Sequence, residues 1–65
     1  MMKILKNEIQ ENNKLIVSSG TDRAEVELFA QDWLDKNYND EKYCAEAKMA
    51  YEVEDGIWEV PYNVI

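Results

Sequence analysis

The fold is decided by residues 43–62, which read YCAEAKMAYEVEDGIWEVPY. From Tyr43 to Val53 every second side chain is an alanine or a larger apolar group, and mostly polar residues lie between them. Alternation with period two over residues 43–54 predicts a strand with one buried face. Alanine, glutamate and lysine also favour helices, so a helix over residues 40–51 is the alternative.

Asp55-Gly56 follows this stretch and favours the strand, because Asp-Gly between two such runs is the strongest short signal for a β-hairpin. Its two-residue loop fixes a register in which Glu54 lies opposite Ile57. The same register predicts three apolar pairs on one face: Val53 with Trp58, Tyr51 with Val60, and Met49 with Tyr62.

A first hairpin is predicted near the N-terminus, from residues 3–9 and 14–18. The four residues between them are Gln10-Glu11-Asn12-Asn13. Asparagine tolerates the positive φ angles of tight turns, so this segment is expected to reverse the chain.

An amphipathic helix is predicted after Ser18-Ser19-Gly20. Either Thr21 or Asp22 can cap it, and Asp22 with Glu25 has the spacing of a capping box. An apolar stripe with helical spacing follows: Val26, Phe29, Ala30, Trp33 and Leu34. The predicted fold is a single α+β domain over residues 1–65, in the order ββαββ, with the amphipathic helix packed on a small antiparallel sheet of about four strands.

The composition is acidic, with enough apolar residues for a small core. The 65 residues include 14 acids and 7 bases, for a net charge of −7, and 46% of them are apolar. Residues 1–20 carry three lysines and two acids, whereas residues 21–65 carry four bases and twelve acids. The longest aliphatic run, Leu15-Ile16-Val17, is far shorter than a membrane span. With a single cysteine and no secretory signal, the chain is expected to be cytoplasmic.

Catalysis is not expected from this set of side chains. The chain has no histidine, which is the commonest general base and metal ligand. Cys44 falls on the polar face of the predicted strand and is interpreted as a bystander thiol. Its acids match no metal-binding motif, and Gly20 and Gly56 are too far apart to form a phosphate-binding loop. We therefore expect no enzyme activity, no cofactor and no metal.

The polar face of the second hairpin is predicted to carry a band of carboxylates. Its members are Glu46, Glu52, Glu54 and Glu59 on the strands and Asp55 at the turn. The register sets Glu52 directly opposite Glu59, and like charges in that position are destabilising. The band is interpreted as a surface for a basic partner, in imitation of a phosphate backbone. The alternative is a solvated face that only keeps the protein soluble.

The helix offers a second candidate surface for a partner. Leu28 is predicted to project away from the apolar stripe, and its neighbours on that side are Glu25, Asp32 and Asp35. An exposed leucine with a polar rim is typical of a docking contact. The alternative is a single exposed leucine without a role.

In length, acidity, lack of catalytic residues and α+β order, the chain resembles the small counter-defence proteins of bacteriophages, of the anti-CRISPR and anti-restriction type. The resemblance implies a small acidic inhibitor acting in the host cytoplasm. Its partner would be a nuclease or a nucleic-acid-binding complex with a basic surface. Direct nucleic-acid binding is not expected, because the tyrosines lie in negative surroundings.

The alternative function is an antitoxin-like or adaptor module that binds through a sheet edge or the helix face. A sheet this small leaves edge strands that can pair across a two-fold axis. The sequence therefore leaves both a monomer and a homodimer open.

Overall fold

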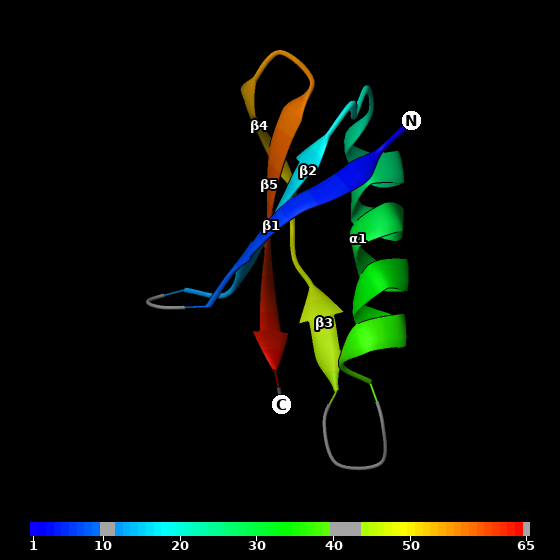
Figure 1. The fold of residues 1–65 in the computed structure, drawn as a ribbon, viewed down its shortest axis with the longest axis vertical. Coiled ribbons are helices and arrows are strands. Elements are labelled where there is room, and N and C mark those ends of the chain that lie inside the picture. The colour runs from blue at the N-terminus through cyan, green and yellow to red at the C-terminus, as the bar shows by residue number, and fades with distance from the viewer. Residues whose placement is uncertain (10–11, 40–43, 65) are drawn as a thin grey trace.

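The computed structural model describes residues 1–9, 12–39 and 44–64. Within these ranges, one helix packs on one face of a five-stranded antiparallel sheet (Figure 1), which confirms the α+β class. The elements in chain order are β1 (Lys3–Glu8), β2 (Lys14–Ser18), α1 (Arg23–Asn37), β3 (Ala45–Ala47), β4 (Tyr51–Glu54) and β5 (Ile57–Val64). The predicted four strands in the order ββαββ need correction, because the third predicted strand is divided into β3 and β4.

β5 is the central strand of the sheet. β2 pairs with one side of β5, while β3 and β4 both pair with its other side. β1 lies outside β2 and forms one edge of the sheet. The predicted N-terminal hairpin is confirmed, with Glu8 opposite Lys14 and a bulge at Leu5.

The helix begins where its sequence predicts. Asp22 is the N-cap, and its Oδ2 accepts a 3.3 Å hydrogen bond from the N–H of Glu25. Lys36 lies in the last turn, where a positive charge favours the helix dipole. The side chains of the stripe that are fully buried against the sheet are Val26, Ala30 and Leu34.

The core lies between the helix and one face of β2 and β5. Alternate residues of these strands point into it: Leu15, Val17, Trp58, Val60 and Tyr62. Trp58 donates a 2.9 Å hydrogen bond from its indole Nε1 to the carbonyl of Gly20. A Cβ at Gly20 would lie 2.5 Å from Val26 Cγ2 and 2.6 Å from Trp58 Cδ1, so this position has room only for glycine.

The predicted long strand over residues 43–54 is interrupted. Ala47 pairs with Tyr62 and Tyr51 pairs with Glu59, so this side holds one residue more than β5 does between the same pairs. Val53 is a second extra residue and forms a bulge before Glu54. After each extra residue, the side chains that would have pointed into the core point outward, and the reverse.

Several predictions for this stretch are therefore wrong. Met49, Tyr51 and Val53 were expected in the core and are exposed, while Ala50 is buried. None of the three predicted apolar pairs forms, because the ladder sets other residues opposite β5: Ala47 with Tyr62, Tyr51 with Glu59, and Glu52 with Trp58. The alternative helix over residues 40–51 is also excluded, since residues 45–47 are a strand; Tyr43 and the rest of residues 40–43 lie outside the described residues.

The helix causes the change of face at Ala50. Glu27 accepts a 2.7 Å hydrogen bond from the N–H of Ala50, and Arg23 donates a 3.0 Å bond from Nε to its carbonyl. The two side chains hold this backbone against α1, so the chain cannot continue the regular ladder of β3.

Polar side chains also cover the outer edge of β3. Gln31 donates a 3.1 Å hydrogen bond to the carbonyl of Ala45 and accepts a 2.8 Å bond from the N–H of Ala47. Asn39, just beyond the helix, bonds to both the N–H and the carbonyl of Ala45. These bonds replace those that a further strand would make, so this edge is closed to another strand.

Candidate acidic binding surface

Glu52 and Glu59 do not face each other. Glu52 pairs with Trp58, and Tyr51 lies opposite Glu59. The bulge at Val53 is the physical reason, because it moves Glu52 by one position along β5. The predicted repulsive pair is wrong, and it no longer supports an acidic sheet face.

Glu59 is instead held in a network on the face of the sheet that lies away from the helix. Its Oε1 accepts a 2.6 Å hydrogen bond from the hydroxyl of Tyr51 and a 2.9 Å bond from Lys14 Nζ. The Tyr51 hydroxyl, and after it the Lys14 ammonium, lower the pKa of Glu59. Glu59 thus stabilises the sheet and is not free for a partner.

The network continues to the edge strand β1. Lys14 Nζ lies 3.5 Å from Oε2 of Glu8, and Lys6 Nζ lies 3.1 Å from Oε1 of the same carboxylate. The bond from Lys6 is the largest effect that lowers the pKa of Glu8. The outer face is therefore a mixed array of charges and not a band of carboxylates.

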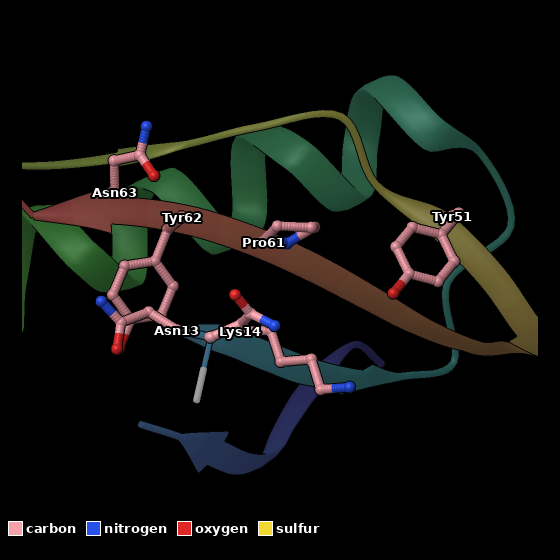
Figure 2. Close-up of a pocket in the computed structure, with 7 residues that line it drawn as sticks. Asn13, Lys14, Tyr51, Pro61, Tyr62 and Asn63 are labelled. Carbon is pink, nitrogen blue, oxygen red and sulfur yellow. The ribbon is translucent and has the colours of Figure 1, made fainter. Parts of the chain in front are cut away.

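A shallow hollow of about 380 Å³ lies beside this network (Figure 2). Its lining residues are Asn12, Asn13, Lys14, Tyr51, Pro61, Tyr62 and Asn63. Sequence reasoning missed it, because Tyr51 reaches this face only through the bulge. Lys14 is the charged group in its lining and is already bound by two carboxylates. Among the described lining residues, the hollow therefore presents amides and phenols and no free charge.

The hairpin turn carries three exposed carboxylates. Gly56 has a φ of 78°, as a tight turn requires, and its N–H donates a 2.9 Å hydrogen bond to Oε2 of Glu52. The side chains of Glu54 and Asp55 are exposed beside it. This bond holds the carboxylate of Glu52 at the turn.

The turn lies beside the N-terminal end of α1. Gly20 donates a 3.1 Å backbone hydrogen bond to the carbonyl of Gly56, which joins the loop before the helix to the hairpin (Figure 1). These two segments, at one end of the molecule, carry five exposed carboxylates. We call this set the acidic end; its members are Asp22, Glu25, Glu52, Glu54 and Asp55. None of them forms an ion pair with another residue in the described parts of the chain. Arg23, next to Asp22 in the chain, donates from its Nε to the carbonyl of Ala50.

The remaining predicted site residues lie away from the acidic end. Glu46 is exposed on β3 and pairs with Asn63, near the C-terminal end of the helix. Asp32 forms a 2.9 Å ion pair with Lys36, and Asp35 accepts a 2.9 Å hydrogen bond from Gln31.

Leu28 is 71% exposed, so its predicted outward position is confirmed. Of the three acidic neighbours predicted with it, Glu25 belongs to the acidic end, Asp32 is paired with Lys36, and Asp35 accepts a hydrogen bond from Gln31. The structure thus divides the predicted helix surface between the two ends of α1.

Other chemistry finds little support in the described residues. Within residues 1–9, 12–39 and 44–64, no three side chains of the types that bind metals gather into a site. Cys44 is exposed, as predicted. Among the described elements, no helix has the length and apolar character needed to cross a membrane.

Comparison with known proteins gives no match: no protein family, no curated protein and no solved structure is similar to this chain.

Proposed function

We propose that the protein is a small non-enzymatic inhibitor that binds a basic, nucleic-acid-handling surface of a partner protein through its acidic end. One observation carries this proposal: five exposed carboxylates from two separate segments lie at one end of the molecule without ion-pair partners among the described residues. The partner would be a nuclease or a nucleic-acid-binding complex, met in the cytoplasm of the cell that contains it.

The acidic end presents clustered negative charges, as a short run of phosphates does. Two of the carboxylates, Asp22 and Glu52, are held by a helix cap and a hairpin turn, so a partner does not have to order these two on binding. Nucleic acid releases its condensed counterions when lysine and arginine side chains neutralise its phosphates, so binding weakens as salt rises. Carboxylates bound by the same side chains are expected to show a salt dependence of the same sign. A negative end also speeds association with a positive site.

The fold gives a reason to treat the acidic end as functional. Unpaired like charges at one end oppose folding through mutual repulsion. Elsewhere on the surface, Glu59 pairs with Lys14 and Asp32 with Lys36, while single carboxylates such as Glu46 have no ion pair among the described residues. The acidic end differs because five such carboxylates lie on two adjoining segments.

The alternative, an adaptor that binds by strand addition, does not fit the β3 side of the sheet. Gln31 and Asn39 already occupy the edge groups of β3. Leu28 is the one large apolar side chain exposed on the described helix, and a single leucine is a small contact. Charge is therefore a stronger basis for recognition than the β3 edge or Leu28.

The test is affinity capture from a bacterial lysate by the immobilised protein, at about 50 and about 200 mM salt. We expect a basic nucleic-acid-binding protein to be retained at the lower concentration and released at the higher one, with its retention identified by mass spectrometry. Capture that survives the higher salt, on a partner without a basic site, would contradict the proposal and support an adaptor.

A further inference from the structure

The outward backbone groups at the two edges of the sheet differ in their hydrogen bonding. On the β3 side, Gln31 and Asn39 bond to the backbone of Ala45, and Gln31 also accepts a hydrogen bond from the N–H of Ala47. On the β1 side, no hydrogen bond from the described residues reaches the outward backbone groups of Asn7. A sheet edge that is left bare is a template for another strand.

The direction of these backbone groups follows from the ladder. The N–H of Tyr62 donates to the carbonyl of Asn13, so the odd-numbered residues of this segment bond to β5 and its even-numbered residues bond to β1. Lys14 and Ile16 therefore bond to their partners Glu8 and Lys6. Asn7, between those two, directs its N–H and carbonyl away from β2.

We infer that the bare edge is the interface of a symmetric homodimer, in which β1 pairs antiparallel with β1 of a second copy around a two-fold axis at Asn7. The segment Leu5-Lys6-Asn7-Glu8-Ile9 is complementary to itself in this register. Lys6 of each copy lies opposite Glu8 of the other, and Leu5 lies opposite Ile9.

Charge complementarity selects both the partner and the register. If the axis moved by one residue, to Lys6 or to Glu8, it would place two lysines or two glutamates directly opposite each other. Lys6 and Glu8 already lie on the same face of β1, 3.1 Å apart, where each can reach the matching charge of the second copy. One five-residue segment thus supplies both halves of the interface.

Apolar exposure points to the same edge. Leu5 is 52% and Ile9 62% exposed, although aliphatic side chains of this size are usually buried. The register sets these two side chains side by side across the axis, twice in the dimer. Pairing would join the sheets of the two copies into one continuous sheet and would leave the acidic end of each copy free.

The first test measures the mass of the full chain in solution by sedimentation equilibrium, up to about 1 mM protein. The inference predicts a concentration-dependent species of twice the 7.6 kDa chain mass. A monomer throughout this range would overturn it, and would leave the β1 edge to a different partner strand.

The second test uses charge variants at the interface. Lys6→Glu sets glutamates against Glu8, and Glu8→Lys sets lysines against Lys6, so each variant alone should dimerise roughly tenfold more weakly. Mixed together, the two variants regain opposite charges in every pair, and native mass spectrometry should show the heterodimer in excess over both homodimers. Circular dichroism of each variant checks its fold. Equal dimerisation of the wild type and of both single variants, or a statistical mixture of species, would overturn the inference.

Discussion

Tyr51 lies opposite Glu59 on neighbouring strands and donates a 2.6 Å hydrogen bond from its hydroxyl to Oε1 of that carboxylate. The pair occupies the place in which the sequence pattern had set Glu52 against Glu59. A repulsive pair is thereby replaced by a charge-assisted hydrogen bond, and Lys14 completes it. On the β4–β5 hairpin, the carboxylates that have no ion pair among the described residues lie at the turn.

Glu59 should therefore behave as a structural residue. Replacing it, Glu59→Gln, removes the charge that Tyr51 and Lys14 bind, and should lower the free energy of unfolding in urea by about 1 kcal/mol at pH 7. Because the pKa of Glu59 is lowered in the folded state, this contribution is present above the ordinary carboxyl pKa and is lost as the pH falls through the folded pKa.

The matched control is Glu54→Gln, which removes an exposed charge from the same hairpin. We expect it to change the free energy of unfolding by less than about 0.5 kcal/mol. Equal effects of the two substitutions would show that the network around Glu59 does not stabilise the sheet.

Tyr62 should make the protein sensitive to alkali. Burial, and after it the neighbouring Tyr38, raise the pKa of Tyr62 to about 12. Stability contributed by the protonated phenol is complete below its ordinary pKa of 10.0 and is lost as the pH rises to about 12. The free energy of unfolding should fall more steeply over this range in the wild type than in Tyr62→Phe. If the free energy of unfolding falls equally with pH in both proteins, the role assigned to Tyr62 is contradicted.

Gly20 should be the least replaceable residue of the loop before the helix. Its Cβ would collide with Val26 and Trp58, so Gly20→Ala should cost about 2 kcal/mol or more of unfolding free energy. The neighbouring Ser19 has a φ of 62°, which favours glycine, and Ser19→Gly should stabilise the fold by roughly 0.5 kcal/mol. Opposite signs for adjacent substitutions, measured by urea unfolding, are the expected result; a tolerated Gly20→Ala would contradict the packing at Trp58.

Gln31 should be needed for the closed edge of β3. Gln31→Leu removes the bonds to Ala45 and Ala47 and should lower the free energy of unfolding by about 1–3 kcal/mol. Asp32→Asn is the control on the next, exposed position of the helix and should change it by less than about 0.5 kcal/mol. If Gln31→Leu is as stable as this control, the hydrogen bonds of Gln31 to the edge of β3 do not stabilise the fold.

Features set by neighbouring residues in the chain were predictable from the sequence, and features set by contacts between distant residues were not. Asp22 caps the helix and Asp55-Gly56 turns the hairpin because each signal acts on its own neighbours in the chain. The break after Ala47 depends on Arg23 and Glu27, which bond to a backbone more than twenty residues away. Small alanines fit either face of a strand, so their alternation does not reveal such a change.

The candidate site was predicted in part for the same reason. Glu52, Glu54 and Asp55 are exposed together because the turn holds them, and no longer-range knowledge is needed for that. The partners of Glu59 were mispredicted because the bulge at Val53 shifts Glu52 along β5 and because Lys14 comes from another hairpin. Asp22 and Glu25 join the turn only through the bond between Gly20 and Gly56, which no local pattern indicates.

The central claim, that the acidic end binds a basic partner, is tested most directly by two variants of equal net charge. The first removes three charges from the acidic end, as Glu25→Gln, Glu54→Gln and Asp55→Asn, and keeps an Asn-Gly turn together with the Asp22 cap. The second removes three charges elsewhere, as Asp32→Asn, Asp35→Asn and Glu46→Gln.

The measurement is the amount of basic nucleic-acid-binding protein that each immobilised variant retains from lysate at low salt, relative to the wild type. We predict that the first variant loses most of this retention and that the second keeps it. Equal retention by both variants, or a loss confined to the second, would contradict the claim.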